Sequence, residues 1–497
     1  MRNAVTLSPG ATRPRTGLAG GTIRVLLAEA LVVPAGLITS VFLARVLGPE
    51  PFGVFMVAAS VVVTLEWIVV TMFSRATVRL VAEAADWRPV GAAVLRWHVG
   101  LGLAAGAALW LSADAVAAAL DEPLLAPCLA LFAIEVPLAC AAAACRSILT
   151  GRQAYRARAI AGAARWIARP VFVVALVAMG LSLTGAILGS ILAALGGFVA
   201  AQLLARVPIA ARRFPARRLW HLALPVFVLA VSLRLLDRLG LLALKALGGS
   251  TADAGWYAAA QSFSVAPGVF AMSFSPLLLA ALTAAQTRGD EPGARRVAQG
   301  ALRLVIGFVP LAAFGAAAAP EVVDLIFGSR FHPAARLVGP LLLGAVALAM
   351  ISVASAILIA RDRVKEASVC LWPLLPLAAA GHVVMVPRLG GMGAALVTCV
   401  AAVAGAVAAL AIIFAVWRVR PPWGTCARSL LLAVLMAAVA LAWPTPGLWL
   451  LVKAAILTAA IAAGFVALGE LDPEDRRALR RIARGSDDAG GHLHSTG

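Results

Sequence analysis

The stretch MGAALVTCVAAVAGAVAALAIIFAVW, from Met392 to Trp417, decides the class of fold because it contains no charged side chain from end to end. A helix rises 1.5 Å per residue, so about 20 apolar residues cross the roughly 30 Å hydrocarbon core of a bilayer. We therefore predict that this stretch is a membrane-spanning helix.

Similar apolar windows recur along the whole chain. Hydrophobic residues make up 62% of the sequence and charged residues 13%, about half the charged fraction of an ordinary soluble protein. We predict an all-α polytopic membrane protein with about 14 transmembrane helices. The windows are 23–45, 52–74, 90–112, 124–145, 166–182, 184–205, 222–244, 255–283, 302–320, 338–360, 368–387, 392–417, 428–444 and 447–468.

The basic residues predict the orientation of these helices. With the N-terminus inside, most of the 42 Lys and Arg residues fall in the segments on the inner side, as the positive-inside rule requires. These segments are 2–24, 75–96, 146–169, 206–218, 288–303, 361–365, 418–428 and 476–484. We expect both termini in the cytoplasm, and the net charge of +19 then reflects topology and contact with anionic lipids. Nucleic acid is not an expected partner, because the charge is spread over many short segments.

An internal repeat divides the chain into halves. LGPEPFGVFMVAAS (Leu47–Ser60) and LGGSTADAGWYAAAQS (Leu247–Ser262) share the pattern G-x-[F/Y]-x-x-A-x-S after a short turn, and LTGAIL (Leu183–Leu188) is echoed by GMGAAL (Gly391–Leu396) at a similar offset. Each half contains six windows, so the two bundles should be parallel repeats, with two extra C-terminal helices. The predicted parts are a cytoplasmic tail (1–21), two six-helix bundles (22–218 and 219–420), a helix pair (421–468) and a second cytoplasmic tail (469–497).

A parallel six-plus-six duplication is a transporter architecture in which two bundles move around a central site. The loops are short, and the sequence contains no Walker A, GxSxG or HExxH motif, so we do not expect an enzyme. The six cysteines form no CxxC pair and no histidine lies at metal-ligand spacing, so no metal or cofactor is predicted.

Three charges interrupt the seventh window: Arg234, Asp237 and Arg238. Each costs about 2.5 to 3.5 kcal/mol at the centre of a span, so these side chains should face something polar. On a helical wheel, Arg234, Arg238 and Lys245 lie within about 40° of one another. One alternative is an internal Arg–Asp ion pair. A single pair neutralises only one arginine, and the remaining charge suits a pyrophosphate, which guanidinium groups bind in a bidentate manner.

Charges also occur in other windows. Arg24 in the first span is either a substrate ligand or a side chain that reaches the headgroups. Glu29, Glu66 and Glu135 lie in the first, second and fourth spans, where an apolar setting favours the protonated carboxyl. They are candidates for coupling carboxylates or partners of the arginines, and neutral acids that pack between helices are the alternative.

Six arginines between Arg146 and Arg169 are expected in the cytoplasmic loop between spans four and five. They are explained either by topology alone or as an electropositive surface that attracts an anionic lipid-linked headgroup.

Four segments together resemble a known family. They are FLARVLGPEPFGVF (Phe42–Phe55), the Asp237–Arg238 pair, GWYAAA (Gly255–Ala260) and IFGSRF (Ile326–Phe331). The chain, over about residues 20 to 420, resembles polysaccharide-repeat flippases of the multidrug/oligosaccharidyl-lipid/polysaccharide (MOP) exporter superfamily.

This resemblance implies a flippase of the bacterial plasma (inner) membrane. It would move polyprenyl-pyrophosphate-linked oligosaccharides to the outer leaflet by alternating access, for the biosynthesis of lipopolysaccharide, exopolysaccharide or another cell-surface polysaccharide. Expected partners are the lipid-linked oligosaccharide, membrane lipids and H⁺ or Na⁺ as the coupling ion, with the protein as a monomer.

Other functions stay open. Many polysaccharide flippases have twelve spans, whereas fourteen also fits a flippase of lipid II, the peptidoglycan precursor. A multidrug antiporter of the same superfamily would need an acidic cavity for cationic drugs, and the seventh span is basic. A membrane-embedded glycosyltransferase or polymerase would normally carry a long extracytoplasmic loop, and none is predicted.

Overall fold

The computed structural model describes residues 25, 27–208, 238–361, 363, 366, 373–419, 421–445 and 447–470. These residues are helical with short connections, and none of them forms a strand. They divide into two compact units. Unit 1 comprises residues up to Phe42, Ala58–Ala118 and Glu122–Val231, whereas unit 2 comprises Leu43–Val57, Ala119–Asp121 and Ser232 onward. The predicted bounds 22–218 and 219–420 of the two bundles stay predictions.

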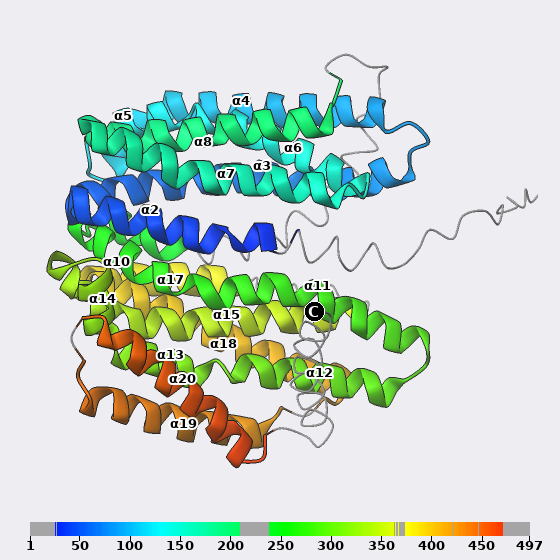
Figure 1. The fold of residues 1–497 in the computed structure, drawn as a ribbon, viewed down its shortest axis with the longest axis vertical. Helices are drawn as coiled ribbons and strands as arrows, with labels where there is room; N and C mark the ends of the chain where they lie inside the picture. Colours follow the sequence, from blue (N-terminus) through cyan, green and yellow to red (C-terminus); the bar gives the residue numbers. More distant parts are fainter. Residues whose placement is uncertain are drawn as a thin grey trace, which may run out of the picture. The chain divides into compact units, whose positions relative to one another are not determined.

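Unit 1 is built from helices of the first half of the chain (Figure 1). They are α2 (Val32–Leu47), α3 (Pro49–Glu83), α4 (Trp87–Ala119), α5 (Leu125–Phe132), α6 (Glu135–Gly151), α7 (Tyr155–Leu176), the π-helical η1 (Val177–Leu181) and α8 (Ser182–Ala205). The last residues of α2 and the first residues of α3, within Leu43–Val57, are assigned to unit 2.

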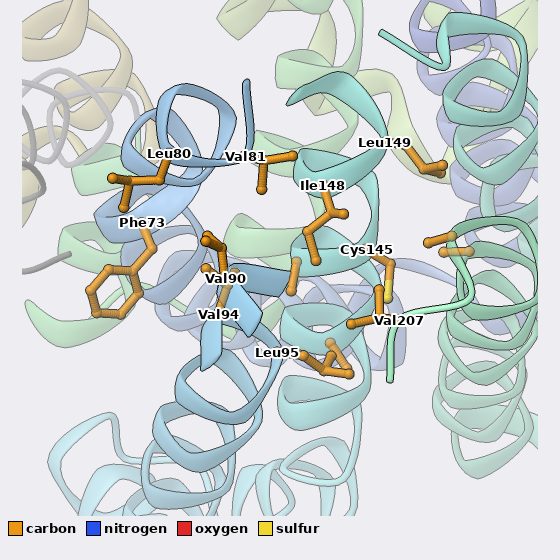
Figure 2. Close-up of a cluster of buried hydrophobic side chains, with 14 of the residues drawn as sticks. Phe73, Leu80, Val81, Val90, Val94, Leu95, Cys145, Ile148, Leu149 and Val207 are labelled. Carbon is orange, nitrogen blue, oxygen red and sulfur yellow. The ribbon is translucent and has the colours of Figure 1, made fainter. Parts of the chain in front are cut away.

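A buried apolar cluster holds α3, α4 and α6 together at one end of unit 1. Figure 2 shows Phe73 and Leu80 from α3, Val94 from α4 and Ile148 from α6 directed into this cluster. The end of α8 packs against it through Ala201 and Ala205, and Val207 follows just beyond the helix. Close packing of this kind fixes the positions of the helices that carry the charged groups described below.

The fourth predicted span is broken at Ala133 and Ile134, between α5 and α6. Pro137 has no N–H group and cannot bond to the carbonyl of Ala133, which explains why the helix is interrupted there. Helix α4 approaches the break closely, because a Cβ at Gly106 would lie only 2.8 Å from the Ala133 carbonyl oxygen. The break makes Glu135 the first residue of α6.

The predicted spans 166–182 and 184–205 form a helical hairpin. Helices α7 and α8 lie side by side (Figure 1), and the chain reverses at Gly180, whose φ of 90° is unfavourable for other residues. Gly189 allows the close approach, since a Cβ there would lie 2.7 Å from the backbone of Val173.

Unit 2 contains the helices of the second half (Figure 1). They are α10 (Thr251–Phe263), α11 (Val265–Thr287), α12 (Glu291–Ile306), α13 (Val309–Ala317), α14 (Ala319–Ile326), the 3-10 helix η2 (Ser329–Ala334), α15 (Ala335–Ala360), α17 (Leu374–Leu389), α18 (Gly391–Trp417), α19 (Trp423–Ala442) and α20 (Trp449–Ala467). The last two pack on α13, and the buried Lys453 of α20 pairs with Glu321 of α14 at 2.9 Å.

The repeated motifs meet inside unit 2. A Cβ at Gly53 would lie 2.0 Å from the carbonyl oxygen of Thr251, and a Cβ at Gly255 would lie 2.2 Å from that of Pro49. Gly53 therefore lies against the carbonyl of the residue four positions before Gly255. Gly255 in turn lies against the carbonyl of the residue four positions before Gly53. Such a reciprocal contact is what two copies related by a twofold axis make, and it supports the duplication inferred from the sequence.

Two further contacts join the segment 42–55 to the segment 326–331. Arg45 donates from Nε to the carbonyl of Ile326 at 2.8 Å, at the last residue of α14, where a cation complements the helix dipole. The ring of Phe52 meets that of Phe331 edge to face at 5.7 Å. The segments that carried the family resemblance, 42–55 and 326–331, therefore pack together.

The membrane class predicted from composition is confirmed. Eleven helical stretches among the described residues are long and apolar enough to cross a membrane, and one of them, 155–205, is the hairpin that turns at Gly180. The count of fourteen stays a prediction, because most of the window 222–244 lies outside the described residues. The windows 255–283 and 302–320 were expected to be continuous. The first breaks at Ser264, and the second breaks at Gly307–Phe308 and again at Ala318.

Candidate functional site

A buried ionic cluster lies inside unit 1. Arg165 of α7 donates through Nη2 to Oε1 of Glu135 at 2.7 Å and approaches Oε2 of Glu66 at 3.3 Å. The three side chains are 4 to 11% exposed. Two carboxylates from α3 and α6 therefore share one guanidinium in the interior of the helical bundle.

The local structure explains how this cluster is accommodated. Glu135 lies in the first turn of α6, where the positive end of the helix dipole stabilises a carboxylate. Gly197 of α8 makes room for Arg165, because a Cβ at Gly197 would lie 2.8 Å from the Arg165 Cβ. Oε1 of Glu66 is buried and has no hydrogen-bond partner in the structure, so one oxygen of the cluster is unsatisfied.

A second ion pair lies on the same helix as Arg165. Arg158 Nη2 contacts Glu29 Oε1 at 2.6 Å. The Glu29 side chain is 43% exposed and the Arg158 side chain 18%, so this pair is more accessible than the cluster around Arg165. Gly162 lies beside it, and a Cβ there would be 3.3 Å from Arg158 Nη1.

The arginines predicted to lie in a loop are mostly on helices. The connection between α6 and α7 is only Arg152–Ala154, so the expected 146–169 loop is wrong. The loop was overestimated because the arginines interrupt the apolar windows, although Ala159 and Ala161 between them are buried. Only Arg152 lies in the connection. It has a structural role there, donating to the Ala205 carbonyl at 2.9 Å and stacking over the Trp87 ring.

Arg158, Arg165 and Arg169 form a stripe on α7. Steps of seven and four residues place them within about 40° of one another at 100° per residue. Arg146 of α6 interacts electrostatically with Arg158, Arg165, Glu29 and Glu66, so it belongs to the same region. Four arginines thus face three carboxylates in this part of unit 1, and the region is basic overall.

The three carboxylates of this region could be identified from the sequence, but their arginine partners were not predicted. The signal was present in the helical spacing of Arg158, Arg165 and Arg169, which places the charges on one face of a helix. The acids were candidates for either coupling carboxylates or partners of arginines, and the structure pairs Glu29, Glu66 and Glu135 with arginines.

The predicted anion site of the seventh span is only partly described. Arg24, Arg234 and Asp237 lie outside the described residues. Residues 238–246 are helical, and Arg238 at their start is partly buried. Lys245, from the same predicted stripe, is 7% exposed and lies with its Nζ 3.4 Å from Thr251 Oγ1. The assignment of Arg24, Arg234, Asp237 and Arg238 as substrate ligands stays a prediction.

Solved structures share this fold at low sequence identity. The lipid II flippase MurJ in an inward closed conformation matches with a TM-score of 0.73 and 15% identity, over 90% of this chain and 98% of that chain. An inward-facing multidrug resistance MATE family transporter of the MOP superfamily matches with a TM-score of 0.61 and 15% identity, over 83% and 98% of the two chains.

A third structure is a MOP superfamily transporter from Pyrococcus furiosus, described as having a binding pocket of reverse polarity. It matches with a TM-score of 0.56 and 14% identity, over 79% of this chain and 93% of that chain. A comparison with curated proteins gave no match. Residues 18–279, more than half of the chain, match the family described as polysaccharide biosynthesis protein. The chain therefore belongs to the polysaccharide biosynthesis protein family and has the fold of the MOP superfamily of transporters and flippases.

Proposed function

We propose that this protein is a flippase that moves a polyprenyl-pyrophosphate-linked oligosaccharide from the inner to the outer leaflet of the bacterial plasma membrane. The observation that carries the proposal is the basic region of unit 1, in which Arg158 and Arg165 are held by carboxylates inside membrane-spanning helices. Membership of the polysaccharide biosynthesis protein family supports a glycan as the transported group.

The ion pairs suggest how a pyrophosphate is bound. Charge-assisted hydrogen bonds from guanidinium are strong for carboxylate and phosphate alike, so a pyrophosphate can replace a carboxylate as the partner of an arginine. The Glu29–Arg158 pair is the more exposed one, and in our proposal it opens first. A carboxylate of this region then takes up a cation, and in our proposal this uptake links the movement of the substrate to that of H⁺ or Na⁺.

The arginines predicted as substrate ligands are a second part of the proposal. Arg24 of the first span and Arg234 and Arg238 of the seventh span are proposed to bind the pyrophosphate, and Asp237 is proposed to orient Arg234 and Arg238. A guanidinium loses relatively little hydration energy when it leaves water, which makes arginine better suited than lysine to a partly dry cavity.

Two alternative substrates are lipid II and a cationic drug. Lipid II also carries a polyprenyl pyrophosphate, so the charged region alone does not separate it from other lipid-linked glycans. A cationic drug, by contrast, is repelled by the excess of arginine in unit 1. Among the three proposed functions, transport of cationic drugs by a multidrug antiporter therefore has the least support.

The decisive experiment is transport in liposomes that contain the purified protein. A fluorescent polyprenyl-pyrophosphate glycan, fluorescent lipid II and a cationic dye are supplied in separate vesicles, with and without a proton or sodium gradient. We expect rapid flipping of the glycan lipid, slower flipping of lipid II and no accumulation of the dye. Dye transport without flipping of either lipid would overturn the proposal.

A further inference from the structure

A polar cavity lies among helix ends of unit 2. Its volume is about 310 Å³, and its lining residues are Gln286, Ala360, Arg361, Arg363 and Val416. Gln286 lies near the end of α11, Val416 near the end of α18, and the other three at and just beyond the end of α15. Helix α15 packs against both α11 and α18 (Figure 1), and the three helix ends meet at the cavity.

Arg361 is held in place on the wall of this cavity. Its Nη1 donates to Glu291 Oε2 at 3.1 Å, and its guanidinium stacks over the Trp417 ring at 4.8 Å. Trp417 also donates to Glu291, so the carboxylate and the ring fix the arginine together. A guanidinium has five N–H groups, and a single hydrogen bond to Glu291 leaves others for a ligand.

Two further donors line the same cavity. The side-chain nitrogen Nε2 of Gln286 is buried and has no hydrogen-bond partner in the structure, although a buried amide nitrogen is normally paired. Arg363 is about half exposed and pairs with Glu366 three residues later, an arrangement that holds a side chain only weakly. None of the five lining residues is acidic.

The position of the cavity indicates the kind of ligand. The helices α11, α15 and α18 have 23, 26 and 27 residues, about one bilayer in length, so their ends lie at the level of the headgroups. The adjoining segments 288–303, 361–366 and 418–428 carry ten Lys or Arg against four Asp or Glu. This excess of positive charge outweighs the partial negative charge of about −0.5 at the C-terminal end of each of the three helices.

We propose that this cavity binds the phosphate group of an anionic lipid, at a site separate from the transport pathway of the proposed function. Arg361 supplies a fixed guanidinium, Gln286 supplies the unsatisfied amide nitrogen, and Arg363 closes over the ligand from the exposed side. The excess of basic residues predicts the cytoplasmic side for these segments, where anionic phospholipids are concentrated. A phospholipid headgroup and the pyrophosphate of a polyprenyl lipid offer the same chemistry.

The test measures lipid binding to the purified, delipidated protein by native mass spectrometry. The probes are dioctanoyl phosphatidylglycerol, the zwitterionic dioctanoyl phosphatidylcholine and a polyprenyl pyrophosphate. We expect Arg361→Gln to weaken phosphatidylglycerol binding by roughly tenfold or more, because a charge-assisted contact is lost. Gln286→Leu should weaken it severalfold. Leucine has no polar side-chain atom that would need a hydrogen-bond partner, so we expect Gln286→Leu to fold. This variant therefore remains informative if Arg361→Gln fails to fold.

The control is Arg288→Gln, which makes the same charge change beside Gln286 at a residue that does not line the cavity. It should bind phosphatidylglycerol like the wild type. If the cavity variants lose binding of both polyprenyl pyrophosphate and phosphatidylglycerol, the cavity is a general phosphate site. If they lose binding of only one of these lipids, that lipid is the ligand of the cavity. Equal losses in Arg288→Gln and Arg361→Gln, or unchanged binding in both cavity variants, would overturn the proposal. These binding measurements do not depend on whether glycan lipids are flipped.

Discussion

At the scale of single residues, Glu66 and Glu135 share Arg165 but differ in their surroundings. Glu135 has the shorter contact, 2.7 Å against 3.3 Å, and lies at the positive end of the α6 dipole. Glu66 has one buried oxygen with no donor. A proton on that oxygen would remove an unsatisfied charged acceptor from the protein interior. We therefore infer that Glu66 is the better candidate for the group that takes up the coupling proton.

The first prediction concerns Glu66→Gln. Gln has nearly the shape of a protonated carboxyl, so we expect the protein to fold and to bind substrate, while flux no longer increases with an imposed proton gradient. The measurement is flipping of a fluorescent glycan lipid in liposomes over a range of pH and gradient. Combining this change with Glu29→Gln tests both candidates, and gradient-dependent flux in the double variant would rule out coupling through these residues.

Glu135→Gln should act differently, through stability. The change weakens the 2.7 Å contact that Arg165 makes in a buried setting, and charged hydrogen bonds contribute about 1.5 to 3 kcal/mol. We expect a loss of roughly 2 kcal/mol, seen as a lower unfolding temperature of the detergent-solubilised protein. Glu83→Gln on the surface, which removes an exposed pair with Arg79, is the control and should change the unfolding temperature little.

The carboxylates could be identified from the sequence, whereas their partners could not. A carboxylate within an apolar window is conspicuous because it is costly there. Arg158 and Arg165 border an apolar window, so they were interpreted as part of a loop. Their spacing signals a shared helix face, but which side chains meet that face depends on packing, here against Gly197 of α8. One sequence does not give that packing.

At the scale of elements, the crossing of α3 and α10 is the clearest trace of the duplication. Matching glycines at 53 and 255 were predicted to be equivalent from their motifs. Their reciprocal contact with the backbone of each other's helix was not predicted, because a motif match does not tell which faces meet. Helix breaks, by contrast, have a signal in the sequence. Pro137 follows the break in the fourth window, and Pro267 follows Ser264, where the eighth window divides.

A prediction for this crossing is that Gly53→Val or Gly255→Val destabilises the protein. A Cβ at either position would lie within about 2.2 Å of a carbonyl oxygen, so the helices must move apart, and overpacking of this kind costs about 1 to 3 kcal/mol. Gly36→Ala on α2 is the matched control, since nothing lies within 4 Å of its Cβ. Thermal unfolding in detergent measures the effect, and equal unfolding temperatures for all variants would show that the crossing is loose.

At the scale of the whole molecule, the distribution of Lys and Arg predicts the orientation in the membrane. Reporter fusions that are active only in the cytoplasm should be active when placed at either terminus or after Arg363, and inactive when placed after Gly180. The hairpin turn at Gly180 and the end of α15 at Ala360 make these sites informative. Activity of the Gly180 fusion would place the α7–α8 turn in the cytoplasm and invert the proposed direction of transport.

The last prediction is that Arg234 and Arg238, in the second half of the chain, bind the pyrophosphate. Replacing both by Gln removes two charges from a span and lowers its cost of insertion, so expression should be retained. Binding should weaken by roughly two to four orders of magnitude, because two charge-assisted contacts of about 1.5 to 3 kcal/mol each are lost.

Asp237→Asn provides the comparison within the same helix. If Asp237 only orients the arginines, its loss should reduce flux less than the double Gln change does. The measurement is the amount of lipid-linked glycan that appears on the outer face of cells that contain each variant at matched protein level. Wild-type flux from the Arg234→Gln/Arg238→Gln protein would mean that these residues form a structural ion pair with Asp237. In that case the α7 stripe, with Arg158 as its most accessible paired member, would have to bind the pyrophosphate without them.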